Sequence, residues 1–600
     1  MNTSGTPSMV STTTTPMFVA VGEESDVAPH VGPATGTQGV TRRSGSSPWA
    51  PFHSEDFTRM ASAQFLSNVG GWMQTVGAQE LMLTLTTSAT LVALVQTVAG
   101  LPVVLFALPA GAIGDLVDRR RLLVGSQSCM LLAALVLAAL AFAGLVTPLV
   151  LLGLIFAVGI GQTLTAPTWQ TLQPELVAPE DRTQAIALGA ANQNLSRAIG
   201  PAIGGALYAA TSAAALFLVN AVSFVPVIGA VARWRGAAKP APVAGPEHVV
   251  DAIRAGARYV ASSPALRVIL LRAGLFMVFA SSIWALLPLV AHSPLHLGSG
   301  GYGLLLGGVG VGAVFGAAAL PRLRARASSS RLMLAGTIVF AAVTLSVAYV
   351  RVSALTALAL VIGGVAWIVV LSTLNSQYQS TLPVWAKARG ISYYLVIFQG
   401  GGALGSAAFG IVAQPAGLTD ALLAAAVGLG VVAIVGIWLP FKDIAPEDLL
   451  PAGDWPDPQV LIPPPSEGPV LVTLESWPSP GRERELVKAL YAGRYARRRT
   501  GATRWRVWSD ATDPGHVLEA FVVGSWAEHL RQHERVSRRD QERLEAIRAM
   551  TDLHRPPTVT HWLAREAYLL RQAATLSGGA VLPSDRLGAW RRIPPLLIGL

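Results

Sequence analysis

Long apolar stretches fill most of the chain between residues 58 and 440, and short polar segments separate them. A helix needs about 20 mostly apolar residues to cross about 30 Å of hydrocarbon. The pattern therefore predicts an all-α polytopic membrane protein of about twelve transmembrane helices in two six-helix bundles. The first set is expected at 58–84, 88–112, 122–145, 148–173, 184–209 and 212–233, and the second at 265–291, 301–321, 331–350, 354–382, 390–414 and 420–440.

Composition supports a membrane environment. The 600 residues are 52% hydrophobic and only 13% charged, with a mean hydropathy of +0.50, whereas soluble domains carry about 25% charged residues. The net charge of +10 could suggest nucleic acid, but the basic residues gather at the ends of the apolar stretches. We therefore expect a lipid bilayer as partner and no nucleic acid. The single cysteine, Cys129, excludes an intrachain disulfide.

Basic residues gather in one set of alternating loops, beginning with Arg119, Arg120 and Arg121. Positively charged loops stay on the cytoplasmic side of a membrane. Both termini and the central loop, 234–264, are therefore expected in the cytoplasm. Within that loop, residues 247–261 predict an amphipathic helix along the inner interface. The tail 1–56 is rich in Ser, Thr, Gly and Pro and lacks a signal-peptide core, so it is expected to be a disordered cytoplasmic tail.

The loop between the second and third apolar stretches has a motif, Gly-x-x-x-Asp followed by basic residues. It resembles the helix 2–3 loop motif of the major facilitator superfamily. Leu116 and Asp118 depart from that motif, in place of a basic residue and a second glycine. The matching positions are Gly111, Asp115, Arg119 and Arg120.

A second motif in the fifth stretch resembles the helix 5 motif of drug/proton antiporters, with Ser196 where that motif prefers glycine. Its matching positions are Gly200, Pro201, Gly204 and Gly205. Across 57–440 the chain resembles the bacterial transmembrane secretion effector and enterobactin-exporter-like branch of the superfamily, on 57–77, 111–121 and 176–205. The resemblance implies a bacterial plasma (inner) membrane and proton-coupled export of a small amphipathic molecule (a drug, siderophore or secondary metabolite) without a cofactor.

Polar side chains inside the spans mark a cavity. Amides in lipid are costly unless they face protein or water. These stripes therefore line a transport cavity or, alternatively, join helices by hydrogen bonds. The candidates are Gln64, Asn68, Trp72 and Gln79 in the first stretch, Gln162, Trp169 and Gln170 in the fourth, and Asn375 and Gln377 in the tenth.

Two ionisable residues lie deep in the predicted spans. Glu80, in the first stretch, suits reversible protonation during transport, or else reaches the outer interface. Arg197, in the fifth, is too deep to reach water, so it needs a carboxylate or carbonyl partner. Asp115 and Glu80 are the nearest candidates by topology. Arg197 therefore serves substrate binding or gating, or forms a structural ion pair.

After residue 441 the chain changes character. A Pro-rich linker (441–468) precedes a segment (469–566) with a β-α-β-β-α-β pattern, which predicts a cytoplasmic ferredoxin-like domain; 567–600 is a tail. The segment resembles dimeric α/β-barrel domains related to antibiotic-biosynthesis monooxygenases, which implies a homodimer through it. His529 and His533 lack a metalloprotease-like frame, so no metal is expected, and its tryptophans are expected in the core.

Three functions remain open at this point. No nucleophile triad, nucleotide motif or phosphate loop is found in the sequence, so a non-enzymatic exporter of a small-molecule substrate is favoured. The alternatives are an exporter fused to an oxygenase-like modifying domain, and a receptor or scaffold that does not transport. Leu320 supports the last of these, because it stands where a second-half loop motif would have an acidic residue.

Overall fold

The computed structural model describes residues 47–234, 249–441, 446–450, 468–513, 515–552 and 554–564. The predicted C-terminal tail, nearly all of the N-terminal tail, and most of the central loop and linker lie outside them. We call α1–α6 the first half: α1 (Glu55–Leu85), α2 (Ala89–Leu116), α3 (Arg119–Phe142), α4 (Pro148–Leu172), α5 (Arg182–Ala210) and α6 (Ala213–Arg233). We call α8–α13 the second half: α8 (Pro264–His292), α9 (Ser299–Arg326), α10 (Ser329–Tyr349), α11 (Ser353–Ser380), α12 (Lys387–Ala416) and α13 (Leu418–Trp438).

Ten of the described helices are long and apolar enough to cross a membrane. The two long helices of these halves that miss the criterion are α1 and α5, although they have 31 and 29 residues. Both are interrupted by polar side chains, including Glu80 in α1 and Arg197 in α5. The amphipathic helix expected at 247–261 is α7 (Val249–Ala261).

Short polar side chains cap the N-termini of several helices. Ser54, Ser88 and Thr147 each accept a hydrogen bond from a backbone N–H three residues later, at α1, α2 and α4. Such caps satisfy donors that a helix start leaves free. Asp118, which departs from the loop motif, caps α3 through Arg121 N at 2.9 Å. The departure therefore has a local structural reason.

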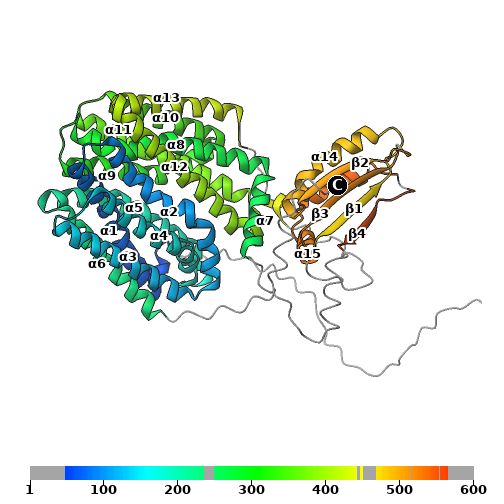
Figure 1. Cartoon of the computed structure of the whole chain (residues 1–600), viewed down its shortest axis with the longest axis horizontal. Coiled ribbons are helices and arrows are strands. Elements are labelled where there is room, and N and C mark those ends of the chain that lie inside the picture. The colour runs from blue at the N-terminus through cyan, green and yellow to red at the C-terminus, as the bar shows by residue number, and fades with distance from the viewer. Residues whose placement is uncertain are drawn as a thin grey trace, which may run out of the picture. The chain divides into compact units, whose positions relative to one another are not determined.

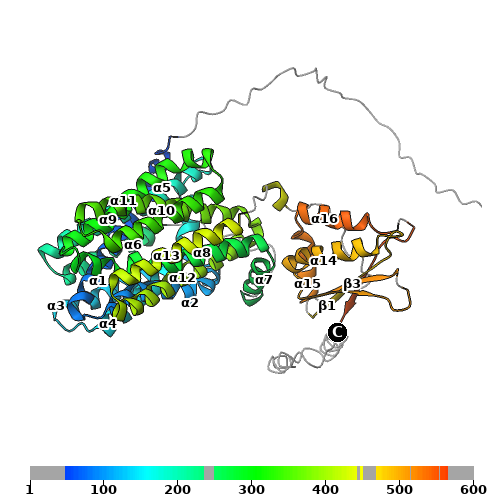
Figure 2. The ribbon, with the colours of Figure 1, turned by 90° about the horizontal axis from the view of Figure 1, so that it is seen from above.

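The two halves meet along two helix pairs. Helix α2 packs against α12, and α5 packs against α9; Figures 1 and 2 both show α2 beside α12. Where α5 crosses α9, a Cβ on Gly205 would lie 2.9 Å from the Cα of Gly303 and 2.5 Å from the carbonyl oxygen of Ser299. Only glycine permits this approach, which is how helices pack closely in lipid.

The second half is packed around aromatic side chains. Trp367 is 5% exposed, and its ring lies 5.3 Å from that of Trp284 and 6.0 Å from that of Phe276. Phe340 and Phe398 contact the same indole at 5.9 and 6.3 Å. These rings belong to one large buried cluster that runs through the second half and gives it a continuous apolar core.

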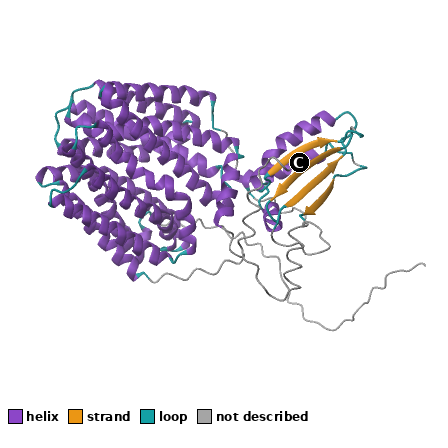
Figure 3. Ribbon diagram, viewed as in Figure 1, coloured by secondary structure: helices purple, strands orange, loops and turns teal. Residues whose placement is uncertain are grey.

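The C-terminal region has the element order predicted for it, with the second helical part split into α15 and α16. Figure 3 shows its sheet in orange. The four strands are antiparallel in the order β2-β3-β1-β4. The elements are β1 (Val470–Ser476), α14 (Glu483–Thr500), β2 (Arg504–Ser509), β3 (Val517–Val523), α15 (Trp526–Glu534), α16 (Arg538–Arg548) and β4 (Thr558–Leu563).

The tryptophans of this region do not gather in one place. Trp505 and Trp526 lie in its core, as expected. Trp508 and Trp562 are exposed, at 39% and 58%, and Trp477 stacks on a histidine ring instead. A single aromatic pocket for a modifying activity is therefore not formed by these five side chains.

Candidate functional site

A cavity of about 380 Å³ lies within the first half. Its walls come from α1, α3, α4, α5 and α6. Six amide side chains face it, and the described lining residues include no ionisable group. The lining consists of Gln64, Ser67, Asn68, Gly71, Trp72, Thr75, Gln127, Met130, Gln162, Thr165, Ala166, Trp169, Gln170, Gln193 and Phe224.

Some of these amides also hold helices together. Gln64 Nε2 donates to Asn68 Oδ1 at 2.8 Å, and Asn68 Nδ2 donates to Asn192 Oδ1 on α5 at 3.0 Å. Gln64 Oε1 stays buried without a hydrogen-bond partner among the described residues. The α1 stripe therefore both lines a cavity and joins helices, and it keeps unused acceptor capacity.

Sequence reasoning missed two of the lining amides, Gln127 and Gln193. Gln127 is 3% exposed and is the only amide in α3. An amide isolated in an apolar span was a signal that could have been followed, because burying it requires a polar surrounding. Gln193 shares α5 with several other amides, so no simple rule separates it from its neighbours.

Glu80 contacts His292 of the second half. Its Oε2 lies 3.3 Å from His292 Nε2, and Glu80 is almost fully buried. His292 Nδ1 lies 3.1 Å from the carbonyl oxygen of Pro288, which can only accept, so Nδ1 carries a hydrogen. At 3.3 Å, Nε2 can either donate a hydrogen bond to a Glu80 carboxylate or accept one from a protonated Glu80. In both arrangements the contact contains one exchangeable proton.

Gln79, beside Glu80, adds two further links between the halves. Tyr302 of α9 donates its hydroxyl hydrogen to Gln79 Oε1, and Gln79 Nε2 donates to the Trp284 carbonyl oxygen at 3.4 Å. This places Gln79 in the joint between the halves, and it is not among the residues that line the cavity. Besides His292, the titratable groups near Glu80 are Tyr208 and Tyr302.

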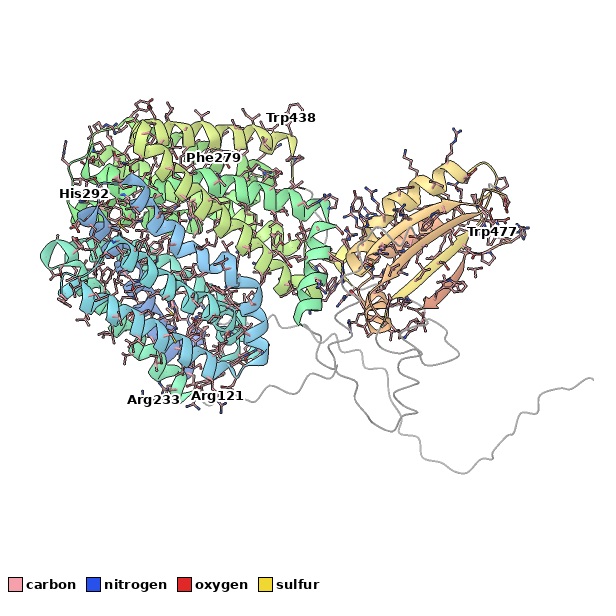
Figure 4. The ribbon with its side chains drawn as sticks, in the orientation of Figure 1. Arg121, Arg233, Phe279, His292, Trp438 and Trp477 are labelled. Atoms are coloured by element: carbon pink, nitrogen blue, oxygen red, sulfur yellow. The ribbon has the colours of Figure 1, made fainter. Side chains whose placement is uncertain are left out.

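These contacts lie at one end of the bundle. Figure 4 labels His292 at the end opposite Arg121 and Arg233; we call the first the His292 end and the second the basic end. The halves are also linked near the His292 end by α2 and α12. There Ser88 Oγ donates to Gln414 Oε1 at 3.0 Å, and Thr90 Oγ1 donates to the Gly410 carbonyl oxygen at 3.2 Å. The halves are therefore joined at this end.

Arg197 is close to the cavity wall. Its guanidinium carbon lies 5.4 Å from the centre of the Trp72 ring, and Trp72 lines the cavity. Nε and Nη1 of Arg197 are buried and have no hydrogen-bond partner among the described residues. Glu80, one partner considered for it, is placed against His292 instead.

The predicted residues of α11 lie elsewhere. Asn375 is exposed and accepts a hydrogen bond from Gln379 at 2.8 Å. Gln377 Nε2 donates to Ser329 Oγ of α10 at 2.7 Å. Neither residue lines the 380 Å³ cavity, because both lie in the last two turns of α11, at the basic end.

The two sequence motifs organise helix contacts. Arg119 pairs with Glu175 at 2.7 Å and Arg120 donates to the Ala232 carbonyl oxygen. Nothing is described of the side-chain surroundings of Gly111 and Asp115. In the α5 motif, a Cβ on Gly200 would lie 2.6 Å from Trp72 Cβ, and one on Gly204 would lie 3.0 Å from Met73 Cα, so α5 lies close against α1. Pro201 and Gly205 contact α9: the carbonyl oxygen of Pro201 faces Gly303.

The comparisons with known proteins decide the family. The model of the transmembrane secretion effector family matches residues 46–568. The chain belongs to this family of the major facilitator superfamily. It is therefore a multi-pass membrane transporter of a superfamily whose members are generally not enzymes.

Two kinds of relatives accompany the family match. A staphyloferrin A transporter of Staphylococcus aureus (strain NCTC 8325 / PS 47) is 30% identical over 165 residues, which are 27% of this chain and 41% of that protein. The chain thus matches less than half the length of that curated relative. Crystal structures of the nucleoside transporter NupG (13% identity, TM-score 0.54) and of a bacterial Spinster homologue (16%, 0.51) cover 65% and 66% of the chain. Those matches span 100% and 97% of the two solved chains and share the fold.

Proposed function

We propose that this secretion effector is a proton-coupled exporter of a small polar or amphipathic molecule that works by alternating access. It crosses a bacterial plasma membrane twelve times, with α1 and α5 as the two polar crossings, in two six-helix halves. The basic end faces the cytoplasm, and so do both termini, because loops rich in arginine stay inside. The proposal requires no cofactor and no metal.

The observation that carries this proposal is the Glu80–His292 contact. If both groups lost their proton, a carboxylate oxygen and a bare ring nitrogen would face each other at 3.3 Å, and two acceptors repel. The contact joins α1 of the first half to α8 of the second. Loss of one proton therefore weakens the joint at the His292 end, and uptake of one proton restores it.

This arrangement gives export a simple order of events. With the His292 end closed, the cavity receives its substrate from the cytoplasm. Release of the shared proton to the cytoplasm then lets the halves separate at the His292 end, and the substrate leaves. A proton taken up from the outside restores the contact and returns the halves to the closed state. One proton enters for each turnover, so the inward proton gradient drives export.

The direction and cargo rest on the relatives. The family is described as a secretion effector, and the Staphylococcus aureus relative is named for staphyloferrin A. A siderophore-like, drug-like or secondary metabolite is therefore the cargo class we favour. The cavity supports a polar cargo, since its six amides can each donate and accept hydrogen bonds.

Retention of compounds in cells tests this function. We expect specific compounds to accumulate in cells that lack the protein, and to be cleared by wild type but not by Glu80→Gln. An uncoupler that collapses the proton gradient should abolish clearance. Glu55→Gln is the control, because Glu55 is exposed at the start of α1 and pairs only with Arg59 among the contacts seen. A receptor or scaffold would leave every compound unchanged, and clearance that survives the uncoupler would exclude proton coupling.

We also propose that the C-terminal region (469–566) is a ferredoxin-like domain that pairs with a second copy. One face of its sheet presents Leu471, Trp508 and Trp562, exposed by 38%, 39% and 58%; the strand register places all three on that face. An open apolar sheet face is a common contact surface. Light scattering of the full chain in detergent should give a dimer, and Trp562→Glu should give a monomer.

A further inference from the structure

Arg197 lies near the middle of α5 (Arg182–Ala210). It follows the start of α5 at Arg182 by fifteen positions, which corresponds to about 22 Å along the helix axis. Depth of this kind prevents the side chain from reaching water at either end. Its nearest described aromatic contact is the Trp72 ring, which cannot neutralise a full positive charge.

The bundle supplies no described carboxylate at this depth. Apart from Glu80, the acidic residues of the described first half lie at helix ends or in loops, namely Glu55, Asp56, Asp115, Asp118, Glu175, Glu180 and Asp181. Glu80 is placed against His292. Nε and Nη1 of Arg197 consequently stay buried and unbonded among the described residues.

Arg272 is a second buried arginine of the bundle, and its contacts can be compared with those of Arg197. Arg272 is 2% exposed, and its Nη1 donates to the Leu439 carbonyl oxygen at 3.1 Å, while its guanidinium lies 4.1 Å from the centre of the Phe441 ring. Its Nε, like that of Arg197, has no hydrogen-bond partner among the described residues, so the difference between the two arginines is the bond from Nη1. Removing one partner of a buried charge is strongly destabilising, because the charge is left uncompensated. Arg197 lacks even this one carbonyl contact: its Nε and Nη1 are buried and unbonded among the described residues.

We infer that Arg197 is the docking point for a carboxylate of the transported molecule. A guanidinium presents two parallel N–H donors that match the two oxygens of a carboxylate. The cavity beside it offers the Trp72 ring and neutral amides such as Gln64 and Asn68, so the rest of the ligand carries hydroxyl or amide groups. This inference rests on the proposed export function, and it narrows the cargo to polar carboxylic acids.

Thermal unfolding of the purified full chain tests the unpaired state without any substrate. Arg197→Gln and Arg197→Met should unfold at the wild-type temperature or up to roughly 4 °C above it, because they remove an uncompensated buried charge. The matched control, Arg272→Gln, should lower the unfolding temperature, because it removes the bond from Nη1 to the Leu439 carbonyl oxygen and the contact with the Phe441 ring. If both Arg197 variants lose stability as Arg272→Gln does, Arg197 is structural and the inference is overturned.

The charge of the cargo gives the second test. Among compounds retained by cells without the protein, we expect carboxylic acids, and Arg197→Gln should clear them at least tenfold more slowly than wild type. Arg197→Lys should restore only part of the clearance, since an ammonium lacks the paired donors. Neutral or cationic cargo would overturn this inference and leave export standing. If no compound depends on the protein, the export function fails, and the unfolding measurement still decides whether Arg197 is unpaired.

Discussion

The two halves of the bundle share a helical plan but differ in what fills them. The first half encloses an amide-lined cavity, and two nitrogens of its Arg197, Nε and Nη1, are buried without a hydrogen-bond partner among the described residues. The second half is filled by aromatic rings packed around Trp367. A buried polar group without a hydrogen bond lowers the stability of the fold, so its presence indicates a functional role. Dense packing of apolar side chains makes a region rigid. The comparison suggests that the first half binds the cargo, while the second moves against it and contributes His292 to the proton-dependent joint.

The largest effect is expected at a close approach between the halves, where α5 crosses α9. Gly205→Leu places a side chain where even a Cβ would lie 2.5 Å from the Ser299 carbonyl oxygen. The crossing of α5 and α9 cannot then close, and transport should fall at least tenfold. Gly153→Leu is the control, because nothing lies within 4 Å of its Cβ position. Wild-type clearance by Gly205→Leu would show that the two halves need not meet there.

A pair of tryptophan variants sharpens the contrast. Trp367→Ala should lower the free energy of unfolding by about 3–5 kcal/mol, because it leaves a cavity in a dense core. Trp72 lines an existing cavity. Trp72→Ala should therefore lower the free energy of unfolding less than Trp367→Ala does, and it should reduce transport more. Unfolding in detergent and clearance in cells, measured on both variants, check this. Equal losses of stability would remove the distinction between the halves.

Substitution of Asn68, an amide of the cavity lining, should have a smaller effect on transport. Asn68→Ala removes hydrogen bonds to Gln64 and Asn192 and one polar group of the cavity wall. The net contribution of such a bond is about 0.5–1.5 kcal/mol, so the apparent affinity for cargo should fall roughly threefold to tenfold. Gln379→Ala, on a residue outside the cavity lining, is the control. A change confined to maximal rate would assign Asn68 to helix packing.

The C-terminal region should leave transport unchanged, but its own stability should depend on pH. His529 Nε2 lies 2.9 Å from His561 Nε2, and burial, with the nearby His533 and His561, lowers the pKa of His529 to about 4. Between that value and the ordinary 6.5 the unfolded chain binds more protons than the folded one. The domain should therefore lose up to about 3 kcal/mol of stability as pH falls from 6.5 towards 4.

Two variants check that assignment. His529→Gln should remove most of the pH dependence of domain unfolding, followed by tryptophan fluorescence. His554→Gln, on an exposed histidine, should keep it. If acid destabilises all three proteins equally, the histidine pair is not the cause. A bundle that unfolds at the same temperature throughout this range would confine the effect to the domain.

The sequence predicted the helices well because a membrane imposes one length and one polarity on each span. Gln64, Asn68 and Trp72 of the α1 stripe recur on one face, and that face lines the 380 Å³ cavity; their part in transport stays a prediction. The side-chain contacts between the two halves could not be predicted from the sequence. The contact between Glu80 and His292 joins residues 212 positions apart, and no periodicity relates them. Asn375 and Gln377 had the right chemistry, yet their place in the last turns of α11 puts them outside the described cavity.

The central claim is that one shared proton holds the halves together at the His292 end. Spin labels on Thr87 and Ser293, in a Cys129→Ala background, measure the separation of the halves there across pH. The account predicts a short distance at low pH that lengthens as the shared proton is lost. In Glu80→Gln the amide can donate to a bare His292 Nε2 or accept from a protonated one, so the contact persists at every pH and the distance should stay short. A wild-type distance that does not change between pH 5 and pH 9 would contradict the account.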